Sequence, residues 1–296
     1  NPDKTAQVLM VLNALGVPIA LLRHLPFAQT KAVGSAMTYI KQLLRDNIAR
    51  KRKVFEDGGR AGEVDILTMA METGNFSDED LLAQMMTFLL AGHETTATAL
   101  VWAVYLLCKH PDVQDRLRRE VRSRIPSLEH DVTAADIDGC HYLQAVMSEV
   151  LRLWPPINLA LRYAAHDTTV QGEHIPKGTT VAISPIPINR STKLWGADAL
   201  EFVPERWLNE DGTANQRGGA ESNFAFLSFI HGPRSCIGQR FAQGEFGCLL
   251  AAWVGRFNTS LEKGSPLETG EPAVKGGVVT KPKGGLWCTL ERLPDW

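Results

Sequence analysis

Cysteine is scarce in this sequence of 296 residues, and the cysteines form no close pairs. No two of them are separated by only two residues, which excludes a CxxC zinc or redox site. An odd number without close spacing favours reduced thiols in a reducing compartment over a disulfide framework. The five cysteines are Cys108, Cys140, Cys236, Cys248 and Cys288.

An excess of basic charge is also lacking. The formal net charge is −2, and the densest run of Lys and Arg is "RKRK" at 50–53. We interpret that run as the end of a helix, where positive charge complements the helix dipole. A near-neutral chain offers little electrostatic attraction to phosphate backbones. The composition therefore argues against nucleic acid as a partner.

No apolar run is long enough to span a bilayer. The most apolar stretch, 8–22, has about 15 residues where a spanning helix needs about 20, and Gly16 and Pro18 interrupt it. A buried hairpin is the simpler interpretation, and a surface that dips into a membrane interface is the alternative. The chain begins at Asn1 without a secretory pattern, so we expect a processed chain or fragment with no transmembrane anchor.

The sequence pattern predicts a mainly helical chain with a smaller β part in its second half. "SDED" at 77–80 is a capping box, and it starts a long apolar helix that ends near Lys109. Turn residues between β-branched runs predict short strands within 157–190 and a closing hairpin at 278–290, with irregular structure at 191–228. Further helices are expected at 31–53, from 111 onward, at 133–154, and from Cys236 to about Phe257.

One cysteine stands between two glycines at the predicted start of a helix, in "FIHGPRSCIGQRFAQGE" (229–245). A thiolate at a helix N-terminus is stabilised by the dipole and by free backbone N–H groups. Gly232 and Gly238 would let a flat, bulky group approach the backbone, and a cysteine thiolate can be the axial ligand of haem iron. Cys236 is therefore a candidate metal ligand, and an inert buried cysteine is the alternative.

A polar group, "AGHETT" (91–96), interrupts the long apolar helix. Buried polar groups need partners or a function, which makes Glu94 and Thr95 candidate catalytic residues. The alternative is a threonine that bonds back to the preceding turn, with the acid at a solvated edge. A zinc-protease HExxH helix is excluded, because Ala97 stands where the second histidine is required.

The helix predicted around "EVLR" carries an acid and a base three residues apart, Glu149 and Arg152. Residues at this spacing are neighbours on a helix surface and can form an ion pair. The apolar residues of the helix fall on the opposite stripe. Periodicity alone therefore predicts a solvated surface pair of little energetic value.

Taken together and in this order, the motifs resemble those of the cytochrome P-450 haem-thiolate monooxygenases. The family pattern F-x-x-G-x-R-x-C-x-G is present without departure as Phe229, Gly232, Arg234, Cys236 and Gly238. "AGHETT" is similar to the family's oxygen-activation helix and "EVLRLWPP" to its E-x-x-R helix. "PERW" (204–207) is similar to the loop whose arginine completes that pair. The order and spacing of the motifs fit over nearly the whole chain. The residues within the motifs are similar to those of eukaryotic, fungal microsomal members.

The resemblance implies the fold and the ligand. It implies a mainly α chain with small β-sheets, forming one haem-binding catalytic domain over residues 1–296. This would be the C-terminal part of the cytochrome P-450 fold, with the family's N-terminal helices and strands absent. Cys236 would be the proximal ligand of haem b, with Phe229 packed near its sulfur and Gly232 and Gly238 letting the loop lie against the porphyrin.

Other matching residues also receive roles from the resemblance. Arg234, Arg162 in "LALRYAA" and His231 would contact the haem propionates. Glu94 and Thr95 would relay protons to dioxygen bound at the iron.

A buried ion network is a further implication of the resemblance. Glu149, Arg152 and Arg206 would form it beneath the haem, which reverses the solvated interpretation drawn from periodicity. Breaking such a network costs about 3–5 kcal/mol.

The activity implied by the resemblance is insertion of one oxygen atom from dioxygen into a lipophilic small molecule. Electrons would come from a separate NADPH-dependent reductase, since no flavin or nicotinamide motif is present in the sequence. The full-length protein would lie on the cytosolic face of the endoplasmic reticulum membrane. Two alternatives stay open: a non-enzymatic remnant without a complete haem site, and a thiolate-haem isomerase or peroxygenase, against which the Glu94–Thr95 pair argues.

Overall fold

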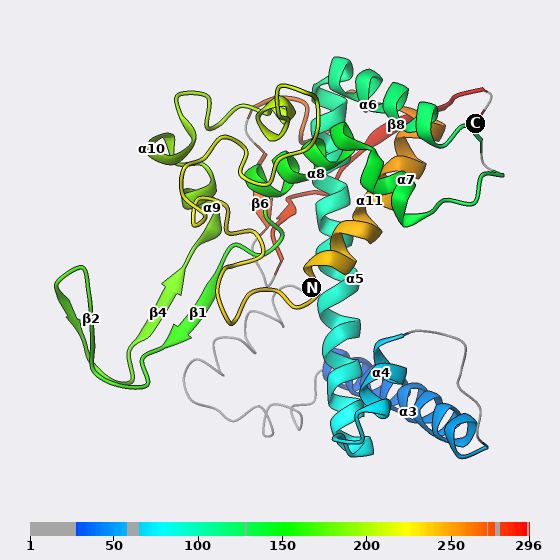
Figure 1. The fold of residues 1–296 in the computed structure, drawn as a ribbon, viewed down its shortest axis with the longest axis vertical. Helices are drawn as coiled ribbons and strands as arrows, with labels where there is room; N and C mark the ends of the chain where they lie inside the picture. Colours follow the sequence, from blue (N-terminus) through cyan, green and yellow to red (C-terminus); the bar gives the residue numbers. More distant parts are fainter. Residues whose placement is uncertain (1–27, 58–64, 128, 271, 276–278, 295) are drawn as a thin grey trace. The chain divides into compact units, whose positions relative to one another are not determined.

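The computed structural model divides the chain into two compact units, Asn1–Ala91 and Gly92–Trp296. The helix α5 (Asp78–Lys109) begins in the first unit and ends in the second (Figure 1). The apolar stretch at 8–22 lies outside the described residues, so its interpretation as a hairpin or interfacial surface stays a prediction. The described residues are 28–57, 65–127, 129–270, 272–275, 279–294 and 296.

The first unit contains α3 (Ala28–Glu56), α4 (Ile66–Glu72) and the start of α5. The predicted capping box is confirmed: the Asp80 backbone N–H donates to Ser77 Oγ over 3.2 Å, and the Ser77 N–H donates back to the Asp80 carboxylate over 3.1 Å. This pairing satisfies two of the donors that a helix start leaves free. The apolar side chains that form the described core of this unit are Leu44, Ile48, Leu67, Leu81 and Leu82.

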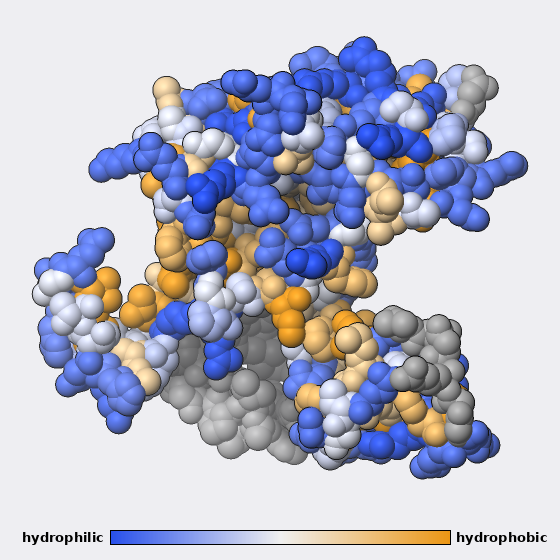
Figure 2. Space-filling model, in the orientation of Figure 1, coloured by the Kyte–Doolittle hydropathy of each residue, from blue (hydrophilic) through white to orange (hydrophobic). Residues whose placement is uncertain are grey.

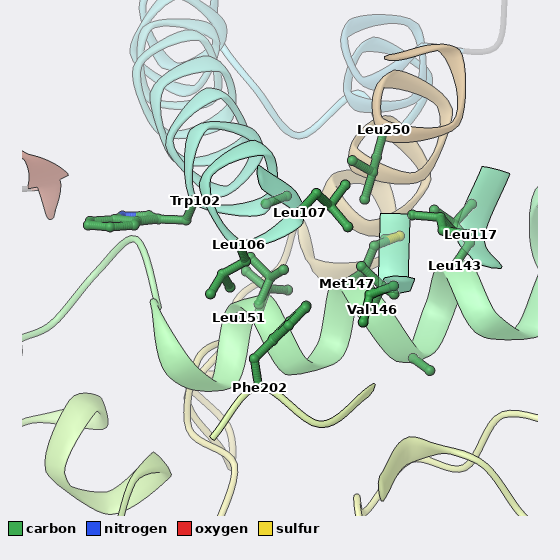
Figure 3. Close-up of a cluster of buried hydrophobic side chains, with 14 of the residues drawn as sticks. Trp102, Leu106, Leu107, Leu117, Leu143, Val146, Met147, Leu151, Phe202 and Leu250 are labelled. Atoms are coloured by element: carbon green, nitrogen blue, oxygen red, sulfur yellow. The ribbon is translucent and has the colours of Figure 1, made fainter. Parts of the chain in front are cut away.

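The second unit is built around the C-terminal half of α5. It adds α6 (Pro111–Arg124), α7 (Ala134–Gly139), α8 (His141–Leu153) and α11 (Gln239–Arg256). All of these were predicted from the sequence within a few residues. No helix within the described ranges is both long and apolar enough to cross a membrane. Their apolar faces meet in one core (Figure 3), which includes Trp102, Leu106, Leu107, Leu117, Leu143, Val146, Met147, Leu151 and Leu250.

The strands pair into two-stranded antiparallel sheets, so the prediction of a mainly helical chain with small sheets is confirmed. β1 pairs with β4, and the hairpin of β2 and β3 extends from the far end of this sheet (Figure 1). β5 pairs with β8, and β6 with β7. Their bounds are β1 Ala160–Tyr163, β2 Thr168–Val170, β3 Glu173–Ile175, β4 Thr180–Ile183, β5 Phe257–Leu261, β6 Val274–Lys275, β7 Lys281–Pro282 and β8 Cys288–Arg292.

The predicted closing hairpin at 278–290 is wrong. The final strand β8 pairs with β5, from Phe257 opposite Arg292 to Leu261 opposite Cys288, while β7 pairs with β6. Gly284 and Gly285 have φ of +88° and +83°, a conformation that glycine adopts without strain. They turn the chain away after β7 and lead it to the open edge of β5, where the longer ladder forms.

The stretch 191–228 has little regular structure, as expected, but it is well packed. It contains α10 (Thr192–Trp195) and the 3₁₀ helix η1 (Pro204–Trp207), and it follows the short helix α9 (Pro185–Asn189), which lies where strands were expected. The rings of Trp195 and Trp207 are 5.7 Å apart. A Cβ at Gly218, where φ is +58°, would lie 2.9 Å from atoms of both rings. Packing against the two tryptophan rings therefore adds to the isolated bridge between Leu208 and Ala214 in fixing this backbone.

Candidate functional site

Cys236 closes a tight loop immediately before α11. Its backbone N–H donates to the Phe229 carbonyl over 2.9 Å, and the Ser235 N–H donates to the Gly232 carbonyl over 3.0 Å. Ile230 and Gly232 have φ of +58° and +85°, a region that is costly for a residue with a branched side chain. The first hydrogen bond joins the backbone of Phe229 to that of Cys236, and packing of the Phe229 ring near the sulfur stays a prediction.

The five cysteines differ in burial: Cys140 is buried, Cys108 and Cys288 are partly buried, and Cys236 and Cys248 are exposed. Burial raises the pKa of Cys108 to about 12 and that of Cys140 to about 11. Burial also raises the pKa of Cys248 and Cys288. Cys236 is exposed, so the inert buried alternative is wrong for this residue.

The start of α11 lies beside this thiol. Gly238 is the N-cap of the helix and makes no side-chain cap, so the first-turn N–H groups and the positive end of the dipole are available to an anion. A Cβ added at Gly238 would lie 4.0 Å from Cys236 Sγ. Glycine here leaves the space above the sulfur open.

Large apolar side chains are exposed next to Cys236 in the sequence and on β1. Ile237 is 88% exposed and Phe241, one turn further along, is 66% exposed. Leu161 and Tyr163 on β1 are also exposed. Apolar residues gather around the start of α11 and the β1–β4 sheet, below the polar surface over α6 and α8 (Figure 2). An apolar surface beside a single thiol suits a flat macrocycle better than a hydrated ion.

The donor set also fits haem iron. No group of three or more His, Cys, Asp and Glu side chains that could hold a metal occurs in the part of the chain that the structure describes. A bare metal ion needs several protein ligands, whereas haem brings its own in-plane ligands and takes an axial cysteine. A single exposed cysteine is therefore enough to ligate the iron of a haem, but not to hold a bare metal ion.

The three residues expected to contact propionates lie on two elements. Arg234 and His231 are in the Cys236 loop and both are exposed, and the His231 ring contacts Phe224 edge-on at 4.8 Å. Arg162 is on β1 and donates to the Leu161 carbonyl over 2.9 Å. Their positive or donor groups suit carboxylates, and their role in binding haem stays a prediction.

Glu94 and Thr95 lie in the middle of α5. The Glu94 carboxylate forms an ion pair with Lys281 of β7, with 2.7 Å between Oε1 and Nζ. The Thr95 hydroxyl donates to the Gly92 carbonyl over 3.4 Å. These are the contacts that the alternative interpretation described, a threonine bonding to the preceding turn and an acid at a solvated edge. They do not conflict with a role in proton transfer, because a hydroxyl can donate one hydrogen bond and accept others, and a carboxylate can accept several.

Glu149 is fully buried, so the solvated interpretation from periodicity is wrong and the buried network implied by the resemblance is confirmed. Its carboxylate accepts five hydrogen bonds. Two come from Arg152, at 2.7 and 2.8 Å, and one from Arg206, at 3.0 Å. The others come from the Val203 backbone N–H and the Trp207 indole. The sequence motifs did not reveal the last two donors.

Arg152 is equally buried, and its remaining donors bind backbone carbonyls. They reach Asn189 at 2.9 Å, Ala199 at 2.6 Å and Glu201 at 3.0 Å. The guanidinium also lies over the Trp195 ring, 5.0 Å from its centroid. A buried charge is tolerated when it is paired and fully hydrogen-bonded, and this network therefore fixes the irregular stretch 189–207 against α8.

Comparison with known proteins matches residues 4–289 to the cytochrome P-450 family model. The chain is similar to cytochrome P-450 monooxygenase sphH of Aspergillus fumigatus, at 46% identity over all of this chain and 54% of that protein. It is 39% identical to cytochrome P-450 monooxygenase ALT8 of Alternaria alternata over all of this chain and 56% of the relative. For cytochrome P-450 monooxygenase buaD of Petromyces alliaceus the identity is 36%, over 95% of this chain and 53% of the relative.

These relatives are fungal, which confirms the prediction of a fungal-like member. The chain spans about half the length of the curated relatives it matches.

Proposed function

The chain belongs to the cytochrome P-450 family, and from that premise we propose that the protein is a haem-thiolate monooxygenase. It inserts one oxygen atom from dioxygen into a lipophilic small molecule. The observation that carries this proposal is the exposed Cys236 thiol just before α11. Gly238 lies beside it without a side chain, and exposed apolar side chains are its neighbours in the sequence. All 296 residues would belong to one haem-binding domain.

The residues of the site would divide the work of holding haem b. Cys236 supplies the thiolate to the iron, and the start of α11 moderates its negative charge. Arg162, Arg234 and His231 supply positive or donor groups to the propionates. When bound, the haem activates dioxygen, one atom of which enters the substrate while the other leaves as water.

Proton supply and electron supply fall to different groups. Thr95 would hold a proton at its hydroxyl on the haem side of α5, and Glu94 would replace it from water at the edge of the helix, where Lys281 contacts it. The two electrons for each turnover would come from an NADPH-dependent reductase. We place the full-length protein and its reductase on the cytosolic face of the endoplasmic reticulum membrane, in contact with the membrane surface.

The proposal is tested by the carbon monoxide difference spectrum of the reduced protein. A thiolate ligand shifts the Soret band strongly to the red, and we expect that shift together with one haem per chain. Absence of haem would instead support the non-enzymatic remnant. A thiolate spectrum with turnover on peroxide alone, and none with reductase and NADPH, would support the isomerase or peroxygenase class.

Replacement of Thr95 by alanine is expected to separate electron use from product formation. NADPH consumption should continue, while more of the electrons appear as peroxide and fewer as product. Positioned acid–base groups typically contribute about 10²- to 10⁴-fold in rate, so the product yield per NADPH should fall at least tenfold. Product, peroxide and NADPH are measured in the same assay.

Thr87→Ala is the matched control, because Thr87 also bonds back to its own helix, at 2.9 Å from the Ala83 carbonyl, but is exposed. It should leave the product yield unchanged. An unaltered yield in the Thr95 variant would remove this residue from the proposed relay.

A further inference from the structure

Asn189, the last residue of α9, is fully buried and uses both ends of its carboxamide. Its Oδ1 accepts from the Leu227 backbone N–H over 2.9 Å, and its Nδ2 donates to Ser228 Oγ over 2.9 Å. The Ser228 hydroxyl in turn donates to the Leu151 carbonyl over 2.6 Å. One side chain therefore holds two consecutive residues that no strand or helix holds.

These two residues stand at the root of the loop that carries Cys236. The Ile230 N–H donates to the Leu227 carbonyl over 2.9 Å, which forms a turn that presents Phe229. The Phe229 carbonyl accepts the Cys236 N–H over 2.9 Å. Three hydrogen bonds, linked through the backbone of Leu227 and the Phe229–Ile230 peptide, thus lead from the Asn189 carboxamide to the backbone of the cysteine.

The other end of the path is the buried ion network. The Asn189 backbone carbonyl accepts from Arg152 Nη1 over 2.9 Å, and Arg152 binds Glu149 through both of its remaining nitrogens. α9 lies beside the segment that leads to α11 (Figure 1). Asn189 is therefore the residue through which a rigid, fully bonded network reaches a loop with little regular structure.

An asparagine is required by the chemistry of this position. Leu227 offers a donor, and the Ser228 oxygen offers an acceptor because its own proton is committed to Leu151. A carboxamide presents an acceptor and a donor side by side, which an ionised carboxylate does not. An aspartate would keep the first bond and lose the second, and an alanine would leave buried polar groups without partners, which is costly.

We propose that Asn189 is a positioning residue for the sulfur of Cys236. It ties the ligand loop to the Glu149–Arg152 network and so fixes where the thiolate stands relative to the iron. This inference rests on the proposed function, in which Cys236 ligates haem. A loosened loop would let the sulfur leave the iron while the rest of the protein stays folded.

The test compares Asn189→Ala with Asn215→Ala in haem-loaded protein. Asn215 makes three comparable bonds, to the Arg206 carbonyl and from the N–H groups of Arg217 and Gly218, but holds the turn at 206–218 instead of the ligand loop. The rate at which the carbon monoxide complex loses its thiolate-type band in dilute urea is measured for both. The thermal midpoint of each haem-free variant is measured alongside, as a readout of general stability.

We expect the Asn189→Ala protein to lose the thiolate band about thirtyfold faster than the parent, the factor expected from its two buried hydrogen bonds at about fivefold each. Asn215→Ala should lose it at the parental rate even where its thermal midpoint falls equally. Asn189→Asp, which keeps one of the two bonds, should lie between, and it replaces the alanine variant if that one fails to fold. Equal rates for the parent and both Asn189 variants, or equal acceleration by Asn215→Ala, would overturn the inference.

The two proposals fail separately. A parent protein with no thiolate band contradicts the proposed function, and the inference about Asn189 fails with it. A parent with the band and an Asn189→Ala variant that retains it equally well contradicts the inference alone.

Discussion

Cys236→Ala abolishes the thiolate-type carbon monoxide spectrum. Cys236 is the exposed thiol that directly precedes the uncapped start of α11, and the space above its sulfur is kept open by Gly238. Removing the sulfur removes the axial ligand, and no neighbouring side chain of the loop replaces it with a thiolate. The loss should be complete, with monooxygenase turnover falling to background. The spectrum and the haem content per chain are the measurements.

The other cysteines provide the matched controls. Cys108, Cys140, Cys248 and Cys288 can each be changed to serine with the thiolate spectrum kept, since burial raises the pKa of every one of them and disfavours the thiolate. The ligand assignment is wrong if the Cys236 variant keeps a thiolate spectrum or if one of the four serine variants loses it.

Glu149→Gln is expected to destabilise the second unit severely. The substitution keeps the shape of the side chain but removes the charge that Arg152 and Arg206 face, and it turns an amide donor toward groups that are themselves donors. Breaking a fully buried ion pair from one side costs about 3–5 kcal/mol. That is a large part of the roughly 5–15 kcal/mol that stabilises a typical domain. Urea denaturation followed by tryptophan fluorescence measures it.

The same substitution at an exposed acid is the control. Glu205, in the second unit, pairs with Arg116 at 2.6 Å, and its side chain is 49% exposed. An exposed pair contributes about 0–1 kcal/mol, so Glu205→Gln should shift the urea midpoint little. Similar small shifts for both variants would show that the Glu149 network adds no more stability than a surface pair.

Local structure was the part of the fold that could be predicted best. The capping box at Ser77 and Asp80 is formed by residues three apart, and the start of α6 at Pro111 follows from the fixed φ of proline. The loop around Cys236 was also predictable, because its glycines and its cysteine act within ten residues of one another. Such features depend on residues that are neighbours in the chain, so they can be predicted from the sequence alone.

The burial of Glu149 and Arg152 shows where periodicity fails. Both lie on the side of α8 opposite its most apolar stripe, yet the stretch 189–207 covers that side and supplies carbonyls, an arginine and a tryptophan indole. The motif resemblance predicted the three charges correctly. It did not predict Asn189 or Trp207, whose roles follow from where an irregular segment packs.

The sequence by itself determined the longer helices of this protein, its family, and the cysteine on which its proposed chemistry depends, because each depends on motifs of residues close together in the chain. The tertiary structure alone decided that β8 pairs with β5, that the charges of α8 are buried, and that Asn189 supports the ligand loop. The physical reason is that these interactions join residues from about 30 to more than 50 positions apart. Which partner wins then depends on the packing of the whole unit, since a strand edge or a buried charge accepts any segment that satisfies its hydrogen bonds.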